Sequence, residues 1–256
     1  MPLSMDRWRG KVAIVTGASA GIGVEIVKQL VDEGVLVVGL ARRVERIEKL
    51  VKELEGKKGK LYALKADVGV EEDILNAFKW TEKNLGPVHI LINNAGVLQD
   101  TNLIDGETQK WKTILDINVL GLCIATREAV RTMRANNVDG HIIHINSVSG
   151  HIVNYFLYMN VYAASKFAVT ALTETLRTEL NTISSKIKVT SVSPGVVATE
   201  IDETSNIYLD AKTLEERKSR AALASSDCAD AVIYALSTSP NCQVHDLIIK
   251  PIGEKF

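Results

Sequence analysis

The chain has 256 residues, a length at which one α/β domain can bury a single large core. Hydrophobic residues make up 46% and charged residues 24%, a balance that excludes collagen-like, disordered, coiled-coil and disulfide-scaffold classes. Thirty Lys and Arg residues stand against 31 Asp and Glu residues, and the net charge of −1 provides no basic surface for nucleic acid or an anionic membrane.

Short apolar runs alternate with segments of helical period along the chain. The runs predict β-strands at Val12–Thr16, Val35–Leu40, Leu61–Leu64, Val88–Ile92, Ile142–Ile145, Lys188–Ser193 and Asp246–Ile249. The periodic segments predict helices at Ile22–Gly34, Val44–Leu54, Glu71–Leu85, Gln109–Ala135, Val161–Thr182 and Cys228–Leu236. Strands that are apolar throughout are buried on both faces. We therefore expect residues 1–256 to form one α/β domain, a single doubly wound parallel sheet with helices on both faces.

The sequence shows no targeting segment and no metal site. It lacks an apolar signal region, and no stretch reaches the roughly 18 apolar residues of a membrane span. Cys123, Cys228 and Cys242 are scattered without a Cys-x-x-Cys pair, which is typical of reduced thiols. The five histidines have no metal-ligand spacing, so we expect structural or surface roles for them. A cytoplasmic location is the simplest interpretation.

A glycine-rich loop, Thr16–Gly23, connects the first predicted strand to the first predicted helix. Glycines are common in ordinary turns, but this loop leads into a helix N-terminus, where free N–H groups and the helix dipole favour an anion. Gly17 allows a tight turn, and Gly21 and Gly23 let a pyrophosphate and the next strand approach the backbone. The loop lacks the lysine of a nucleoside-triphosphatase loop, so it favours a dinucleotide.

The second predicted strand leads into Arg42 and Arg43. Dinucleotide-binding folds that select NAD usually carry an acid there for the adenosine ribose, whereas here the first acid, Glu45, lies inside the next predicted helix. Two guanidinium groups suit a 2′-phosphate, which arginine binds with paired hydrogen bonds. Arg43 can equally be a solvated charge at the helix start, but Arg42 favours cofactor contact. The sequence predicts NADP(H) over NAD(H).

Tyr162 and Lys166 lie four residues apart on a predicted helix, so their side chains share one face. A phenol with a pKa of ~10 is a weak base at neutral pH, and a neighbouring ammonium lowers that pKa. The pair can then act as general acid/base on a carbonyl or alcohol oxygen. Ser147 follows a strand at the edge where such sheets bind ligands, and its hydroxyl can reach the same oxygen.

Each of these assignments has an alternative. Tyr-x-x-x-Lys pairs occur on helices by chance, and Ser147 can also cap a turn. The rival side chains are Ser149, Tyr155 and Tyr158. Neither rival tyrosine has a lysine four residues later, which favours Tyr162.

The order of these motifs resembles the short-chain dehydrogenase/reductase family over almost the whole chain. The resemblance rests on Thr16–Gly23, Asn93-Asn94-Ala95-Gly96, Asn118, Ser147, Tyr162, Lys166 and Pro194-Gly195. It implies a Rossmann-type sheet, a bound NAD(P)H and hydride transfer between the nicotinamide and an alcohol/ketone pair.

The resemblance assigns four catalytic residues. It makes Tyr162 the acid/base and implies that Lys166 lowers its pKa and holds the nicotinamide ribose. By the same resemblance Ser147 orients the substrate oxygen, and Asn118 holds a water of the proton relay. With the loop and the arginine pair, it gives as cofactor contacts Gly17, Ser19, Gly21, Ile22, Gly23, Arg42, Arg43, Asp67, Val68, Asn94, Ala95, Gly96, Tyr162, Lys166, Pro194, Gly195, Val197 and Thr199.

Within the family the chain is similar to insect-type NADP-dependent farnesol dehydrogenases and related vertebrate 17-/3-ketosteroid reductases. Segments that carry this similarity include Gly140–Ser147 and Ser193–Val197. The gap between Ser147 and Tyr162 is longer than in most of the family, as in this subgroup. The C-terminus lacks the Val-Asp-Gly-Gly ending of many bacterial members, which makes the usual tetramer a weaker expectation.

Three further expectations concern the substrate and assembly. The apolar segment His151–Met159 would line a lipophilic pocket, a subunit contact or the core. The segment Glu200–Leu223 corresponds to a mobile substrate lid in the family. The resemblance also implies a homodimer or homotetramer through the helices Gln109–Ala135 and Val161–Thr182.

The sequence thus predicts an NADP(H)-dependent oxidoreductase acting on a lipophilic alcohol/carbonyl pair, and farnesol dehydrogenase activity is the first hypothesis. An NADPH-dependent steroid or general carbonyl reductase is the second. A catalytically idle NADP(H)-binding regulatory module is an alternative from another class. The set Ser147, Tyr162 and Lys166 speaks against it, because a module without turnover has no need of a lysine-activated phenol.

Overall fold

A computed structural model describes residues 3–153, 160–201, 205 and 220–254. The strands are β1 (Val12–Thr16), β2 (Leu36–Ala41), β3 (Lys60–Lys65), β4 (Val88–Asn93), β5 (His141–Ile145), β6 (Lys188–Pro194) and β7 (Asp246–Ile249). The α-helices are α1 (Gly21–Asp32), α2 (Val44–Glu53), α3 (Glu71–Leu85), α4 (Thr108–Leu115), α5 (Leu122–Ala135), α6 (Asn160–Thr182) and α9 (Ser225–Ser237). Short helical turns are η1 (Asp6–Trp8), η2 (Asp116–Gly121) and η3 (Val148–Gly150).

The seven strands form one sheet in the order β3-β2-β1-β4-β5-β6-β7, and every neighbouring pair is parallel. The chain builds outward from β1 to β3, returns to the centre for β4 and then builds toward β7. The strand order therefore reverses between β1 and β4, where doubly wound sheets bind ligands beyond the strands' carboxyl ends. The predicted fold class is confirmed.

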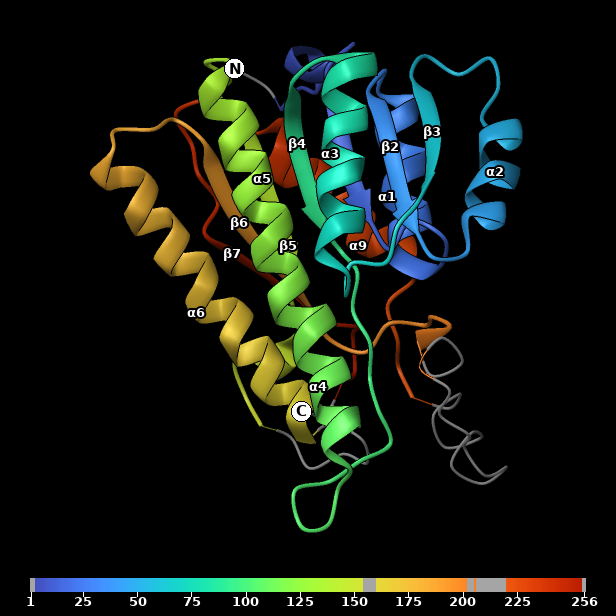
Figure 1. The fold of residues 1–256 in the computed structure, drawn as a ribbon, viewed down its shortest axis with the longest axis vertical. Coiled ribbons are helices and arrows are strands. Elements are labelled where there is room, and N and C mark those ends of the chain that lie inside the picture. Colours follow the sequence, from blue (N-terminus) through green and yellow to red (C-terminus); the bar gives the residue numbers. More distant parts are fainter. Residues whose placement is uncertain (1–2, 154–159, 202–204, 206–219, 255–256) are drawn as a thin grey trace.

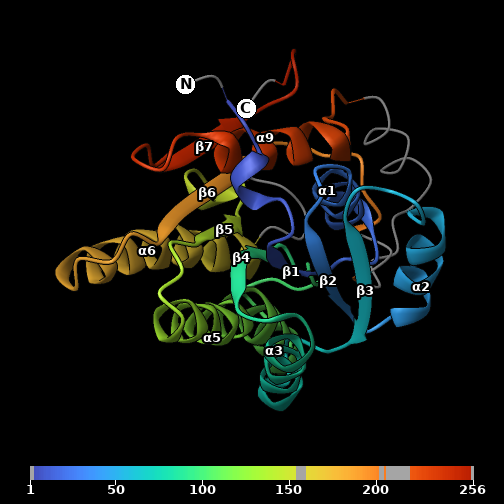
Figure 2. The ribbon, with the colours of Figure 1, turned by 90° about the horizontal axis from the view of Figure 1, so that it is seen from above.

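Helices cover both faces of the sheet. Seen from above, α1 and α9 lie on one side, and α3, α5 and α6 lie on the other (Figures 1 and 2). Successive side chains of β1 alternate between the two cores. Ala13 and Val15 pack with the α1 and α9 side, whereas Ile14 packs with Phe78 of α3. A strand buried on both faces is apolar at most positions, and in β1 only the terminal Thr16 is polar, which explains the continuous run in the sequence.

The prediction of one regular helix over Gln109–Ala135 was wrong. The structure has α4 and α5 joined by η2, one stretch of wide π-helical turns. Gly121 at its end lies against the carbonyl oxygen of Val68, with no room for a Cβ. The apolar spacing continues through the segment, so periodicity could not indicate the wider turn, a feature that often marks functional sites.

The other predicted elements are confirmed, with boundaries that differ by a few residues at most. The N-terminal turn η1 packs on the end of α9, where the Trp8 indole and the Arg7 guanidinium both donate hydrogen bonds to the carbonyl of Leu236. In the described part of the chain, no helix is long and apolar enough to cross a membrane.

Candidate active site

The glycine-rich loop after β1 adopts a backbone conformation that requires glycine at several positions. Gly17 and Gly21 have positive φ angles of 66° and 53°, which favour glycine. Gly23 lies so close to the carbonyl oxygen of Gly17 that a Cβ would overlap it. At the start of α1, Ala20 offers no side-chain cap, so the N-cap side chain does not occupy the place of an anion. This geometry fits a pyrophosphate at the start of α1.

Residues after β4 hold this loop in place. The amide nitrogen of Asn94 donates to the carbonyl oxygens of Thr16 at 2.9 Å and Gly17 at 3.2 Å. In return, the Thr16 hydroxyl accepts hydrogen bonds from the backbone N–H groups of Asn94 and Ala95, both at 3.0 Å. A Cβ on Gly96 would lie 3.9 Å from Nζ of Lys166, which places this segment between the loop and the Tyr162 region.

The two predicted arginines follow β2. Arg42 is exposed and Arg43 is partly buried. Neither side chain forms a hydrogen bond or ion pair with the described residues, whereas nearby Arg46 pairs with Glu200 at 2.7 Å. Guanidinium groups without a partner among the described residues suit the 2′-phosphate of NADP(H).

Asp67 and Val68 follow β3, the strand beside β2, and both are partly buried. Oδ1 of Asp67 accepts a hydrogen bond from the N–H of Gly69 at 2.9 Å, and its own N–H donates to Asp73 at 2.8 Å. The side chain of Val68 packs on the core between the sheet and α3. The predicted adenine pair therefore lies at the same sheet edge as the arginines.

Ser147, Tyr162 and Lys166 lie where β5, η3 and α6 meet. Ser147 caps η3, and its hydroxyl accepts a hydrogen bond from the N–H of Ser149 at 3.1 Å. Nζ of Lys166 donates to the carbonyl of Ile145 at 2.8 Å and lies 5.7 Å from the centre of the Tyr162 ring. All three side chains are buried. The rival Ser149 supports Ser147 through its backbone.

The predicted lowering of the Tyr162 pKa by Lys166 is not found in this structure. Burial raises the pKa of Tyr162 to about 12, and a hydrogen bond with Ser147 only partly opposes it. Burial also lowers the pKa of Lys166 to about 8. Both shifts have one cause, because each charged form loses its hydration in the interior. The ammonium is bound to a backbone carbonyl and does not offset this cost for the phenolate.

Asn118 lies within the wide turns of η2, and its side chain is fully engaged. Oδ1 accepts from the N–H of Val97 at 2.8 Å, and Nδ2 donates to the carbonyl of Val97 at 3.0 Å and to Ser165 at 3.1 Å. The Ser165 hydroxyl in turn donates to the carbonyl of Tyr162. Asn118 therefore joins the loop after β4 to α6. Both Nδ2 hydrogens are used within the protein, so a water at this side chain could only donate to Oδ1.

The segment after β6 contacts the end of β7 on one side and the glycine-rich loop on the other. The N–H of Gly195 donates to the carbonyl of Ile249 at 2.8 Å, and Val197 pairs with Leu223. The methyl group of Thr199 would lie 3.2 Å from a Cβ on Gly21, so Thr199 lies beside the glycine-rich loop. Its predicted phosphate contact is compatible with this position.

Sequence reasoning missed Glu254. Its side chain is only 4% exposed, and Oε2 accepts a hydrogen bond from the N–H of Val196 at 3.2 Å. The same oxygen fills the place of a Cβ on Gly195, which explains glycine after Pro194. The glycine is the only sequence signal, and it does not identify its neighbour.

Two histidines of β5 have the structural roles that the sequence predicted. His141 and His144 are buried, and their ring nitrogens lie 2.9 Å from the hydroxyls of Thr190 and Thr173. Burial lowers the pKa of His144 to about 3 and that of His141 well below its usual value, so both are neutral. No group of metal-ligating side chains gathers in the part of the chain that the structure describes.

The predicted substrate segments lie largely outside the described residues. Of His151–Met159 only residues 151–153 are described, and Tyr155 and Tyr158 lie outside. Ile152 and Val153 are exposed. Of the expected lid Glu200–Leu223, residues 202–204 and 206–219 lie outside as well.

Comparison with known proteins agrees with this geometry. The short chain dehydrogenase family matches residues 11–208. The chain is 52% identical to farnesol dehydrogenase from Aedes aegypti over 254 residues, 98% of this chain and 100% of that protein. It is 43% identical to Homo sapiens dehydrogenase/reductase SDR family member 11, covering 96% of each chain. The closed form of serine dehydrogenase complexed with NADP+ has a TM-score of 0.86 at 29% identity, covering 96% of both chains. The chain therefore belongs to the short-chain dehydrogenase/reductase family.

Proposed function

We propose that the protein is an NADP(H)-dependent enzyme that interconverts a lipophilic alcohol and its carbonyl, with farnesol as the first substrate to test. Family membership makes it an oxidoreductase that acts on CH–OH donors with a nicotinamide cofactor. The observation that carries the reaction is the meeting of Ser147, Tyr162 and Lys166 at the carboxyl edge of the sheet. The 52% identity to farnesol dehydrogenase supports the substrate class.

The residues of the site divide the chemistry between them. The bound nicotinamide supplies or accepts the hydride. Tyr162 moves the proton at the substrate oxygen, and the hydroxyl of Ser147, hydrogen-bonded to Tyr162, orients that oxygen. With a pKa of about 12, Tyr162 holds its proton at neutral pH, which suits protonation of a carbonyl. In alcohol oxidation the phenol must first lose that proton, and the hydrogen bond with Ser147 favours this loss.

The first experiment measures initial rates of nicotinamide absorbance change with farnesol, using NADP+ and NAD+ in parallel. We expect turnover with NADP+ and little with NAD+. A preference for NAD+ contradicts the cofactor proposal. The absence of turnover with either contradicts the farnesol proposal, and the assay is then run with NADPH on a steroid ketone and a simple diketone. Turnover there would support the carbonyl-reductase alternative.

The arginine pair is tested by replacing both residues. Arg42→Ala combined with Arg43→Ala should raise the KM for NADP+ about 10–100-fold, because hydrogen bonds to a charged group contribute about 1.5–3 kcal/mol. The KM for NAD+ should not change. Lys49→Ala removes a charge from the exposed face of α2 and is the matched control. Equal losses with both cofactors would place the arginines outside 2′-phosphate recognition.

For assembly we propose a homodimer or homotetramer through α5 and α6. A groove of about 570 Å³ between these helices is lined by apolar side chains that include Leu122, Val130 and Leu176, with Arg127 at its rim. Such a groove fits a second copy better than open solvent. Light scattering that gives a monomer at micromolar concentration would contradict this proposal.

We also propose the cytoplasm as the location. The support is that Cys123, Cys228 and Cys242 are all free thiols, which suits a reducing compartment.

A further inference from the structure

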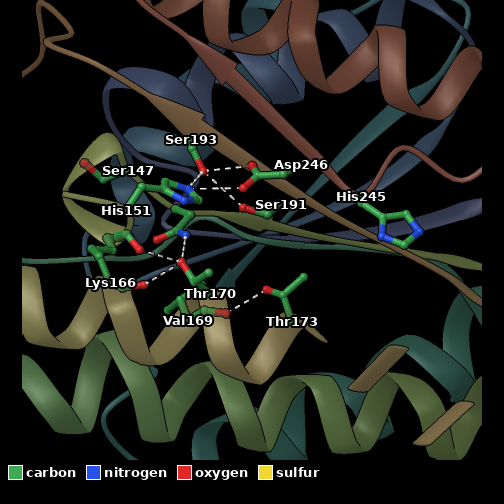
Figure 3. Close-up of polar contacts among 12 residues, drawn as sticks. Ser147, His151, Lys166, Val169, Thr170, Thr173, Ser191, Ser193, His245 and Asp246 are labelled. Carbon is green, nitrogen blue, oxygen red and sulfur yellow. Dashed lines mark hydrogen bonds and ion pairs between the residues drawn. The ribbon is translucent and has the colours of Figure 1, made fainter. Parts of the chain in front are cut away.

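A polar cluster outside the Tyr162 region joins η3 to the last two strands. Nε2 of His151 lies 2.9 Å from the hydroxyl of Ser193 on β6 and 3.1 Å from Oδ2 of Asp246 on β7. The Ser193 hydroxyl donates to Oδ1 of Asp246 at 3.0 Å and lies 3.1 Å from the hydroxyl of Ser191. Figure 3 shows the His151 ring pointing from η3 toward Ser193 and Asp246.

The contact with Asp246 determines which ring nitrogen of His151 carries a hydrogen. A carboxylate only accepts, and Nε2 lies 3.1 Å from Oδ2 of Asp246. Nε2 of His151 must therefore carry a hydrogen and donate it. The cluster is not a nucleophilic serine triad, because serine and carboxylate meet the same ring nitrogen and Ser193 is fully buried. The geometry supports a structural role for the cluster rather than nucleophilic attack by Ser193.

One end of this contact is anchored in the sheet. Arg177 of α6 donates to the carbonyl of Val189 at 3.2 Å and to the carbonyl of His245 at 3.1 Å, the residue before Asp246. The charge of Asp246 favours the Arg177 cation in return. The carboxylate that receives His151 is thus attached to a fixed strand.

The other end leads directly to Ser147. The N–H of His151 donates to the carbonyl of Val148 at 3.0 Å, and the N–H of Gly150 donates to the carbonyl of Ser147 at 2.9 Å. From the opposite side, Thr170 of α6 donates to the carbonyl of Gly150 at 2.9 Å. The three-residue turn η3 is therefore held from two sides. On the α6 side, the Thr170 side chain binds the backbone of the turn, whereas on the sheet side the contact is made by the side chain of His151, the residue that follows the turn.

We propose that His151 is a positioning residue that, through Asp246 and Ser193, fixes the turn carrying Ser147. Without this contact, η3 loses its side-chain attachment to β6 and β7 and keeps its contact with α6 and the backbone hydrogen bond of Asn146 to Val192, so the Ser147 hydroxyl is held less firmly relative to Tyr162. Misplacement of an orienting group lowers the rate of the chemical step more than it changes cofactor binding. The inference rests on the proposed role of Ser147.

The test compares two replacements of equal reach. His151→Phe keeps the ring without the donor, whereas His151→Gln keeps an N–H near the position of Nε2. In the protein without cofactor, amide hydrogen exchange at Ser149 and Gly150 should be about tenfold faster in His151→Phe and close to wild type in His151→Gln. His89→Phe, which changes a partly buried histidine hydrogen-bonded to Pro87, should leave that exchange unchanged.

The kinetic arm uses the substrate that wild type turns over. His151→Phe should lower kcat about tenfold with the KM for NADP+ within about twofold, and His151→Gln should restore most of kcat. Asp246→Ala should lower kcat similarly and add little to His151→Phe, because both remove one contact. Wild-type exchange and kcat in His151→Phe, or equal losses in His151→Gln, would overturn the proposal. If wild type turns over no substrate, the proposed function fails, and the exchange arm still decides the positioning role.

Discussion

The two halves of the site lie at one edge of the sheet but are built from different contacts. The loop at residues 16–23 is fixed by close packing at its glycines, with Gly23 against a carbonyl oxygen, and by the Asn94 side-chain amide, which donates to two of its carbonyls. The cluster of Ser147, Tyr162 and Lys166 is held by side-chain and capping hydrogen bonds. We therefore expect the glycines of the loop to tolerate no larger side chain. The Ser147 cluster should tolerate substitutions that keep the hydrogen-bond donor or acceptor.

The largest effect is expected in the second half, from the loss of one oxygen. Tyr162→Phe keeps the buried ring and removes the proton donor, so kcat should fall by about 10²–10⁴-fold. NADPH binding, followed by fluorescence titration, should stay near wild type because the volume is unchanged. This variant also tests the idle-module alternative, since a binding module would lose nothing measurable. Retained turnover would exclude Tyr162 as the acid/base.

In the first half, one added carbon should weaken cofactor binding as much as the loss of the two arginines does. Gly23→Ala places a methyl group against the Gly17 carbonyl and 2.7 Å from Nδ2 of Asn94. Overpacking of this kind costs about 1–3 kcal/mol, so NADPH should bind about 10–100-fold more weakly. Gly69→Ala is the control, because its Cβ would lie 3.3 Å from the Asp67 side chain and meet no backbone. Equal affinities for the two variants would contradict a loop held by close backbone approach.

The same contrast explains what the sequence could predict. Apolar runs predicted all seven strands, because strands buried on both faces are mainly apolar even where single positions, such as His141 and His144 of β5, are polar. The glycines and Tyr162–Lys166 were found because their geometry depends on local spacing. The contacts of His151 with Ser193 and of Glu254 with Val196 join residues 42 and 58 positions apart. No local pattern encodes such a pair.

Two further differences arise from environment rather than position. The sequence predicted a lowered pKa for Tyr162, whereas burial raises it to about 12, because spacing shows that Lys166 is near but not that the phenol is buried. The wide turns at Asn118 were missed because an inserted residue leaves the apolar period on both sides intact. Burial and backbone insertions are properties of the assembled fold.

The two buried histidines of β5 also make the stability of the protein sensitive to acid. Burial lowers the pKa of His144 to about 3 from the usual 6.5, so between these values the unfolded chain binds more protons than the folded one. Stability should therefore fall as the pH drops below 6.5. Between pH 7 and 5 His144 should account for about 2 kcal/mol, and His141 acts in the same direction. Urea unfolding at both pH values measures the difference, which should shrink in His144→Gln. Equal stability at the two pH values would contradict a neutral buried pair.

The smallest effect on cofactor binding should come from replacing Glu254, which makes both a side-chain hydrogen bond and a close contact with a glycine. Its carboxylate accepts from the N–H of Val196 and fills the space beside Gly195. Glu254→Ala removes this hydrogen bond, worth about 1 kcal/mol, together with the ion pair to Lys250 at 3.4 Å, and should weaken NADPH binding about fivefold. Gly195→Ala alone should weaken it more, because the new methyl group overlaps the carboxylate. In the double variant that overlap is gone, and the combined loss should be smaller than the sum of the single losses. Additive losses would mean that the carboxylate is not what makes glycine necessary, and that Gly195 serves the cofactor through its backbone alone.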